Sequence, residues 1–321
     1  MSKRGASSDS VVLDRGSWQV MVLPELGGAI GRCRWRHPDG RMVDLLRPIS
    51  DADLAAHDVE GAACFPLLPF SNRIRDGRFS FAGRTVAIPR NTAGKHPEHG
   101  HGWQRPWSVL ARDATGVTIG YSHHKREGSW STWPYAYEAR QSISIGAAGL
   151  EFAISARNLD TRPMPFGFGL HPYFPRTPRC TLRAEIGGFW QTDAEVLPVK
   201  LIEVPAPFDV RRGLAMDGIA IDNAFAGWSG AATIEWPEQR TRLHLAATEP
   251  LRFLVVYVPD AATEATESAV GRTPYFCAEP VSNMTDAFNQ AAAGRRDTGM
   301  IVLEPGARIE ARLCLSPEPT G

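Results

Sequence analysis

The sequence predicts an all-β protein, built as one large antiparallel sandwich or barrel. Short segments in which apolar and polar residues alternate recur along the chain, as expected for strands with one buried face. Gly (30 residues) and Pro (25 residues) make up about 17% of the 321 residues, against roughly 12% in average proteins. This density of turn residues favours many short strands over long helices.

The clearest strand patterns lie in the middle and at the end of the chain. Residues 150–156 and 309–315 each place apolar side chains at every second position. Residues 79–88 read as a hairpin that turns at Ala82-Gly83. Further strands are predicted over residues 18–23, 31–36, 107–112, 117–122, 135–145, 231–236, 242–247, 251–258, 274–278 and 299–303.

Helical segments are restricted to residues 51–59 and 286–293, and neither alternates with strands as βαβ units require. No internal repeat, charge block or low-complexity linker divides the chain. We therefore predict a single domain over residues 1–321. The first ~15 residues are expected to be disordered, as chain ends often are.

Charge and hydropathy exclude several classes of function. Lys+Arg and Asp+Glu are both 35, so no net field attracts nucleic acid or anionic lipid. The longest apolar runs, such as residues 253–258, are far shorter than the ~20 residues of a membrane helix. No apolar signal-peptide region follows the N-terminus, which predicts a cytoplasmic protein. Five widely spaced cysteines without a CxxC pair indicate buried free thiols.

Chemistry-bearing residues gather at four places, the first within residues 69–79. Asn72 and Arg73 stand there between an apolar segment and the predicted hairpin. A guanidinium fork beside an amide suits vicinal hydroxyls. Taken alone, however, the segment is better explained as a solvated surface turn.

The second place is a loop that contains His96, His99 and His101, followed by tryptophans. Pro97 and the neighbouring glycines exclude a helical HExxH zinc site. A metal site on a loop remains an alternative, although no further ligand is evident. The preferred interpretation is a loop that presents one neutral imidazole to a polar ligand.

The third and fourth places each offer one ionisable group at a predicted strand end. His171 is the only ionisable residue of the apolar, glycine-containing segment 166–174, where desolvation would lower its pKa. Glu279 ends an apolar strand and is either a hydrogen-bonded structural carboxylate or a general base. Asp222 is a weaker instance of the same pattern. A lone histidine in such a setting is more often a core residue, but the flanking glycines and Pro172 favour a site.

Together these segments resemble the aldose 1-epimerase (mutarotase) family, whose members share a galactose mutarotase-like β-supersandwich. The matching stretches, in the family's order, are SNRIRDGRFSFAG, EHGHGWQRPW, GFGLHPYF, IDNAF, CAEPVSNMTDAF and LEPGARIEARL. They run from about residue 20 to residue 315 and so cover nearly the whole chain. The most specific part is HPYF, followed much later by a strand-end glutamate and a downstream aspartate.

The resemblance implies roles for individual residues. His171 would protonate the ring oxygen, Glu279 would take the proton of the C1 hydroxyl, and His99 would be the family's other site histidine. Arg73 and Asp222 would hold sugar hydroxyls, and Asn72 beside Arg73 is assigned to substrate binding with them. The family commonly has His-Gly-Gly where this chain has His99-Gly100-His101-Gly102, so His101 is the alternative sugar contact.

We therefore predict a mutarotase that interconverts the α and β anomers of an aldose, as a monomer or homodimer, without metal or other cofactor. One alternative is a hexose-6-phosphate 1-epimerase, for which Arg73, Arg75 and Arg105 would form a phosphate cradle. The other is a sugar-binding module without turnover on the same fold. The presence of both His171 and Glu279 argues against the latter, because binding alone needs no acid–base pair.

Overall fold

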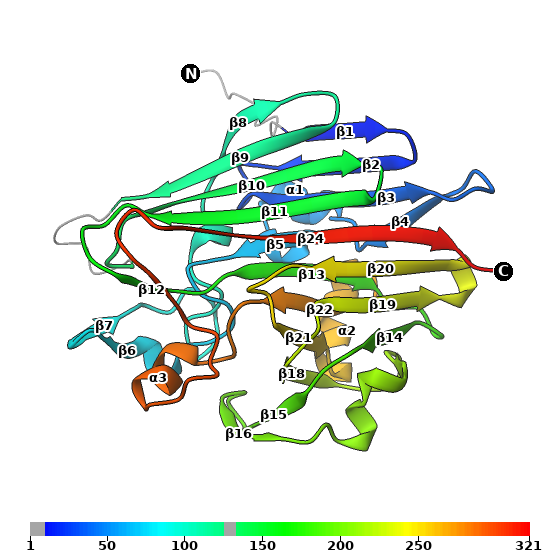
Figure 1. Cartoon of the computed structure of the whole chain (residues 1–321). Helices are drawn as coiled ribbons and strands as arrows, with labels where there is room; N and C mark the ends of the chain where they lie inside the picture. The colour runs from blue at the N-terminus through cyan, green and yellow to red at the C-terminus, as the bar shows by residue number, and fades with distance from the viewer. Residues whose placement is uncertain (1–9, 125–132) are drawn as a thin grey trace.

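Two large antiparallel sheets dominate the computed structural model, which describes residues 10–124 and 133–321. Figure 1 shows them as two layers of strands, with the long strands of one sheet crossing in front of the other. The predicted all-β class is confirmed. No helix in the described part of the chain combines the length and apolar character that a membrane span requires.

The first sheet has eleven strands and carries most of the residues discussed below. In spatial order they are β1 (Val11–Arg15), β2 (Trp18–Leu23), β3 (Ala29–Arg36), β5 (Cys64–Leu67), β13 (Gly169–Pro175), β22 (Tyr275–Val281), β21 (Phe253–Val258), β18 (Ile221–Ala226), β15 (Gly188–Thr192) and β16 (Pro198–Ile202), with β4 (Met42–Leu46) paired to β3.

The second sheet has nine strands, and two separate two-stranded pairs accompany the large sheets in the described residues. Its spatial order is β17 (Leu214–Ala215), β14 (Thr181–Ala184), β19 (Ala231–Trp236), β20 (Thr241–Ala247), β24 (Arg308–Pro319), β11 (Gly149–Asn158), β10 (Tyr137–Gly146), β9 (Gly116–His123) and β8 (Ser108–Arg112). The short pairs are β6 (Arg78–Phe81) with β7 (Arg84–Ala87), and β12 (Met164–Phe166) with β23 (Ile301–Leu303).

The alternating patterns become neighbouring strands of the second sheet. β11 and β24 pair in a register that sets Ile154 opposite Ala311, and both side chains are buried. Burial of a side chain such as isoleucine stabilises the fold by about 1.5–3 kcal/mol relative to leaving it exposed. The predicted hairpin is also present, with Ala82 and Gly83 both at positive φ in its turn. The alternating patterns therefore predicted correctly which face of these strands is buried.

Helices are short and lie outside the sheets. The two predicted segments contain α1 (Asp51–Ala56) and α3 (Ala287–Ala292), whereas α2 (Ala261–Ala269) was not predicted. A 3₁₀ helix, η1 (Val59–Gly61), follows α1. The expectation of a disordered first segment is wrong for Val11–Arg15, which form β1, and its remaining part at residues 1–9 lies outside the described residues.

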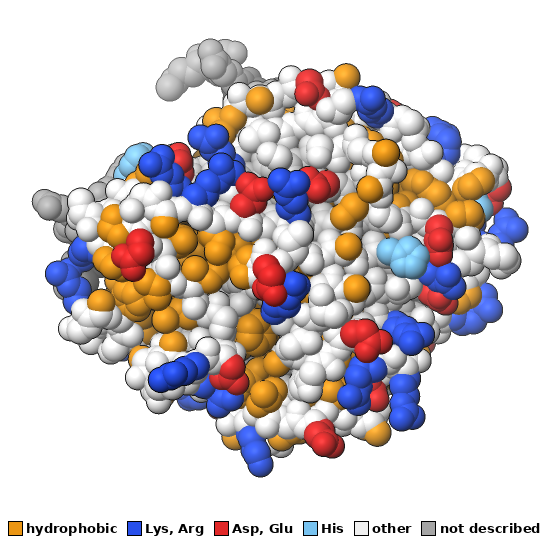
Figure 2. Space-filling view, viewed as in Figure 1, with side chains coloured by type: hydrophobic (Ala, Val, Ile, Leu, Met, Phe, Trp, Pro, Cys, Tyr) orange, Lys and Arg blue, Asp and Glu red, His pale blue; other side chains and the backbone are white. Residues whose placement is uncertain are grey.

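The cysteines and the surface agree with the expectations from composition. All five cysteines are free, and all but Cys314 are buried. On the face shown in Figure 2, acidic and basic side chains are interspersed, as the equal numbers of the two charges would suggest.

The central candidate site residues come from the middle of the eleven-stranded sheet. β13 and β22 are adjacent there, and successive side chains alternate between the two faces of each strand. Leu170 and Phe276 point to one face and are buried in the core. His171 and Glu279 point to the other face, where loops and α2 surround them.

Candidate active site

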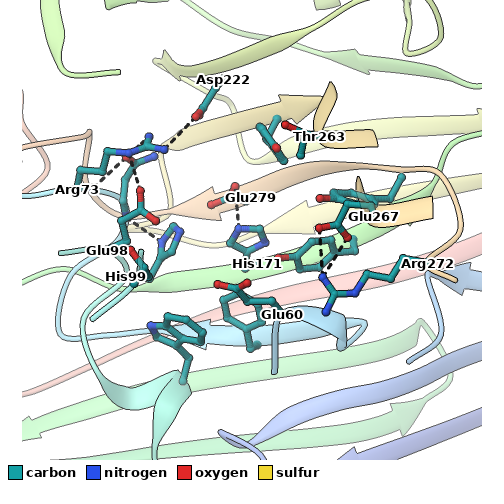
Figure 3. Close-up of a pocket in the computed structure, with 17 residues that line it drawn as sticks. Glu60, Arg73, Glu98, His99, His171, Asp222, Thr263, Glu267, Arg272 and Glu279 are labelled. Carbon is teal, nitrogen blue, oxygen red and sulfur yellow. Dashed lines mark hydrogen bonds and ion pairs between the residues drawn. The ribbon is translucent and has the colours of Figure 1, made fainter. Parts of the chain in front are cut away.

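A cavity of about 290 Å³ opens over β13 and β22. This is close to the small end of the ≈ 300–1,000 Å³ range of ligand sites and suits a ligand the size of one sugar ring. Figure 3 shows polar side chains converging on it from several elements. Its lining consists of Glu60, Phe65, Asn72, Arg73, Thr92, Glu98, His99, Trp103, His171, Tyr173, Asp222, Tyr257, Thr263, Glu267, Arg272, Tyr275 and Glu279.

His171 and Glu279 form the buried centre of this cavity. The register of β13 and β22 pairs Tyr173 with Cys277 and Gly169 with Val281, which sets His171 opposite Glu279. His171 Nε2 lies 3.4 Å from Glu279 Oε1. The imidazole packs against Phe65 and Tyr173, each with a ring-centroid distance of 4.7 Å, and these two rings also contact each other at 5.9 Å. This aromatic packing restricts the orientation of the imidazole.

Burial shifts both groups toward their neutral forms. It lowers the pKa of His171 from 6.5 to about 3, and the charge of Arg47 acts in the same direction. It raises the pKa of Glu279 well above its usual value, aided by Asp222 and opposed by Arg73. His171 Nδ1 and Glu279 Oε2 have no hydrogen-bond partner among the described residues. Buried polar atoms without partners are costly, and these two belong to side chains that line the cavity.

His99 enters the cavity from the histidine loop and is held by Asn72. The backbone N–H of Asn72 donates to His99 Nδ1 over 3.1 Å, and the N–H of His99 donates to the carbonyl of Asn72 over 2.9 Å. Because Nδ1 accepts, the proton of the neutral ring is on Nε2. Burial, with His171 nearby, keeps the pKa of His99 well below 6.5. His99 therefore offers a neutral N–H donor to a ligand.

The local backbone is strained where these two residues meet. Asn72 and His99 both have positive φ, at 57° and 60°. Such strain in residues other than glycine concentrates at functional sites. Gly100 is also at positive φ, and a Cβ there would lie 2.1 Å from the carbonyl oxygen of Leu68. Only glycine allows the two segments to approach this closely, which explains the glycine after His99.

Arg73 is fixed at one end of the cavity by two carboxylates. Its Nε lies 2.6 Å from Glu98 Oε1, and its Nη2 lies 3.2 Å from Asp222 Oδ2. Figure 3 shows this triad on one side of His171. With both partners fixed, the arginine and its carboxylates offer ordered donors and acceptors for hydroxyl groups.

His101 lies outside the cavity, contrary to its predicted alternative role as a sugar contact. Its Nε2 is 3.0 Å from the hydroxyl of Tyr137, and its ring centroid is 4.5 Å from that of His123. Gly100, at its positive φ, separates the two histidines in the loop, and they leave it toward different surroundings. The structure thus brings His99, and not His101, to the cavity.

The three loop histidines do not form a metal site among the described residues. His96 pairs with Glu195, His99 faces the cavity, and His101 contacts Tyr137. A different group, His171, Cys277 and Glu279, brings one possible ligand atom each within 4.8 Å of one another. These residue types are compatible with a divalent ion.

Arg75 and Arg105 do not join Arg73 at the cavity. Arg75 is half-exposed and pairs with Asp193 at 3.6 Å, while Arg105 lines a separate surface depression. The three arginines therefore form no common phosphate cradle, and the prediction of one is wrong.

Sequence reasoning missed a second polar end of the cavity. It contains Glu60 from η1, Thr263 and Glu267 from α2, and Arg272. Figure 3 shows Glu267 and Arg272 across His171 from Arg73. No local motif marks these residues, although the Asp260 cap of α2 was a readable helix-start signal.

Comparisons with known proteins agree on one family. A sequence model of the aldose 1-epimerase family matches residues 9–316. The uncharacterised protein YphB of Escherichia coli K12 is 29% identical over 308 residues, which cover 95% of this chain and 98% of YphB.

Solved structures show the same fold. A crystal structure from Escherichia coli K12, described as a candidate aldose 1-epimerase, has a TM-score of 0.83 and 28% identity, covering 97% of this chain and 99% of that one. A galactose mutarotase-like protein from Clostridium acetobutylicum has a TM-score of 0.81 at 19% identity, covering 97% and 95%. The predicted galactose mutarotase-like sandwich is thereby confirmed, and the chain belongs to the aldose 1-epimerase family.

Proposed function

We propose that this protein is an aldose 1-epimerase that interconverts the α and β anomers of a free aldose. The observation that carries the proposal is the His171–Glu279 pair, buried in a sugar-sized cavity with one unpartnered polar atom on each side chain. Anomer exchange needs one group that gives a proton and another that takes one. Family membership supports the same activity.

The reaction proceeds by opening and reclosing the sugar ring. Glu279 takes the proton of the C1 hydroxyl, the bond between C1 and the ring oxygen breaks, and His171 gives a proton to that oxygen. The aldehyde then turns about C1–C2. On closure the hydroxyl oxygen attacks the other face of C1, His171 regains its proton, and Glu279 returns its own to the former carbonyl oxygen. Atoms and charge balance without a cofactor.

The electrostatics of the pair suit this exchange of roles. Since burial disfavours both charged forms, it favours the arrangement in which the shared proton is on Glu279. This state serves ring closure, in which the acid group is the carboxyl. Ring opening starts with the proton on His171. Both placements have the same net charge, so the pair as a whole stays neutral throughout the cycle.

Other side chains would bind and orient the sugar. His99 Nε2–H is a donor, while Arg73, Glu98 and Asp222 present fixed groups to hydroxyls. Phe65 and Trp103, stacked with centroids 5.2 Å apart, give an apolar wall. Fixed contacts of this kind position the ring while leaving C1 free to turn.

The direct experiment is polarimetry on a panel of freshly dissolved aldoses, run with and without protein. We expect accelerated mutarotation of at least one free aldose, retained after Glu304→Gln, an exposed site outside the cavity, and lost after His171→Asn. A protein that binds a sugar without accelerating its mutarotation would be a binding module instead, and the proposal would fail.

A further inference from the structure

The cavity carries more negative than positive side chains. Five carboxylates and two arginines line it: Glu60, Glu98, Asp222, Glu267, Glu279, Arg73 and Arg272. This imbalance differs from a phosphate-binding site, in which cations and N–H donors face the ligand. How these charges act on a ligand depends on which of them are already paired within the protein.

Both arginines are occupied by carboxylates. Arg73 is held between Glu98 and Asp222, as described above. Arg272 Nη2 lies 2.8 Å from Asp53 and 2.6 Å from Asp58, and its Nη1 lies 3.0 Å from Glu267. Neither guanidinium is left to neutralise an anionic ligand.

Glu60 is the carboxylate that remains without a partner at the cavity mouth. Its backbone is anchored, because its N–H donates to Asp58 Oδ1 over 3.0 Å and its carbonyl accepts from Arg47 Nη2 over 2.7 Å. Arg47 itself lies over the rings of Tyr173 and Tyr275, 4.2 and 4.4 Å from their centroids. No side chain in the described ranges binds the Glu60 carboxylate, which Figure 3 shows across His171 from Glu279.

The cavity holds a second carboxyl group with an oxygen atom that has no partner in the described part of the chain. Glu279 is only 2% exposed, and its Oε2 has no partner among the described residues. The field at Glu60 is also negative on balance: partial burial and the charge of Asp58 raise the pKa of Glu60, against the opposing charge of Arg272, and Glu98 and Glu267 add to the rise. A ligand entering the cavity thus meets the unpaired carboxylate of Glu60 and, deeper, the Glu279 carboxyl group that pairs with His171.

We propose that Glu60 is a specificity-determining residue that makes this cavity accept uncharged or ammonium-bearing aldoses and reject aldoses that carry a carboxylate or phosphate. The inference rests on the proposed mutarotase function and adds its selection by charge. Specificity of this kind arises as much from repulsion of the wrong ligand as from attraction of the right one.

The test uses three sugars of nearly equal shape and different charge. The best free hexose of the polarimetric panel is compared with its uronate, which bears a carboxylate at C6, and with its 2-amino-2-deoxy derivative at a pH where the amine is charged. Exchange between anomers is measured by NMR above the uncatalysed rate, for the wild type, Glu60→Gln and the control Glu304→Gln. Thermal melting checks that each variant is folded.

We expect the wild type to discriminate against the uronate by about 100-fold or more in kcat/KM and to turn over the amino sugar at least as well as the hexose. Glu60→Gln should reduce the discrimination against the uronate about tenfold, mainly through KM, because one repelling charge is removed. Glu304→Gln should leave it unchanged. Equal turnover of uronate and hexose by the wild type, or discrimination that Glu60→Gln does not alter, would overturn the inference.

Failure of the proposed function gives a different result. If no sugar is turned over, the same three sugars are titrated while the total tryptophan fluorescence, to which Trp103 in the cavity contributes, is followed. Preferential binding of the amino sugar that weakens in Glu60→Gln would retain the charge selection without catalysis. Equal binding of all three would refute it.

Discussion

The molecule contains two contrasting clusters of buried and partly buried histidines. The cavity cluster comprises His99, His171 and Glu279, and the core cluster comprises His101, His123 and Tyr137. Burial lowers the pKa of every histidine in both clusters. The difference lies in what surrounds the polar atoms.

In the core cluster one ring nitrogen of each histidine has a hydrogen-bond partner within the protein. His101 Nε2 meets the Tyr137 hydroxyl, and His123 Nε2 lies 2.8 Å from the carbonyl of Trp133. In the cavity cluster, His171 and Glu279 each keep one atom without a partner beside an open volume. A shifted pKa alone therefore does not mark a catalytic group, whereas an unsatisfied polar atom at a cavity does.

The largest expected effect is on catalysis by the cavity cluster. His171→Asn should lower kcat by about 10²–10⁴-fold, because it removes the titratable ring but keeps a polar side chain. The double variant His171→Asn, Glu279→Gln should lose little more than either single variant, since the pair acts as a unit. Initial mutarotation rates measure both quantities. Losses that multiply would show that the two residues act independently.

Substitution of the two loop histidines should affect different properties, mainly activity for His99 and mainly stability for His101. His99→Ala should reduce kcat/KM by about tenfold or more through loss of a ligand contact, with a smaller loss of stability because the backbone N–H of Asn72 loses its acceptor. His101→Ala should lower the free energy of unfolding by about 2–4 kcal/mol, because it leaves a void and an unpaired Tyr137 hydroxyl. Urea titration and rates per folded molecule distinguish the two. The opposite pattern would move the ligand contact to His101.

Acid should destabilise the protein through its buried neutral histidines. Burial, assisted by His123 and Arg105, lowers the pKa of His101 from 6.5 to about 3, so the unfolded chain binds the proton more tightly. Its stabilising contribution is present above pH ~6.5 and is lost as the pH falls toward 3, by at most about 1.4 kcal/mol per pH unit.

Urea titrations at pH 7.5, 6 and 5 test this slope. His101→Gln should flatten it relative to the wild type, since glutamine does not titrate. Parallel slopes for the two proteins would mean that His101 is not held neutral by burial.

The smallest expected effect is that of metal removal on the mutarotation rate. His171, Cys277 and Glu279 could ligate an ion, but the proposed proton transfers do not require one. Dialysis against a chelator should leave the mutarotation rate unchanged within error. A loss of rate that one equivalent of a divalent ion restores would assign this cluster to a metal and replace the acid–base account.

Local sequence patterns predicted the fold well where one face of a strand is buried. β11, β24 and the β6–β7 hairpin follow from alternation and turn residues. β22 is buried on both faces, so alternation is weak there, and its polar residue Glu279 was the only sign of a site. α2 escaped prediction because its small and polar residues form no apolar stripe, and none of them is buried.

The candidate site was predictable only where its residues lie in recognisable motifs. His171, Glu279, His99, Arg73 and Asp222 meet at the cavity as expected. The second polar end was not predictable, since it depends on long-range contacts: Arg272 and Asp53, for example, are 219 positions apart. No rule of sequence spacing connects an arginine with so distant an aspartate. Their pairing follows from the tertiary fold alone.

The most direct test of the acid–base account is the mutarotation rate of Glu279→Gln on the best aldose of the panel. Glutamine keeps the size and much of the hydrogen-bonding capacity of glutamate but cannot take a proton. We expect kcat to fall by about 10²–10⁴-fold, equivalent to roughly 3–5 kcal/mol of barrier, while the protein stays folded and KM changes little. A stably folded Glu279→Gln protein with near-normal mutarotation would contradict the assignment of Glu279 as the base.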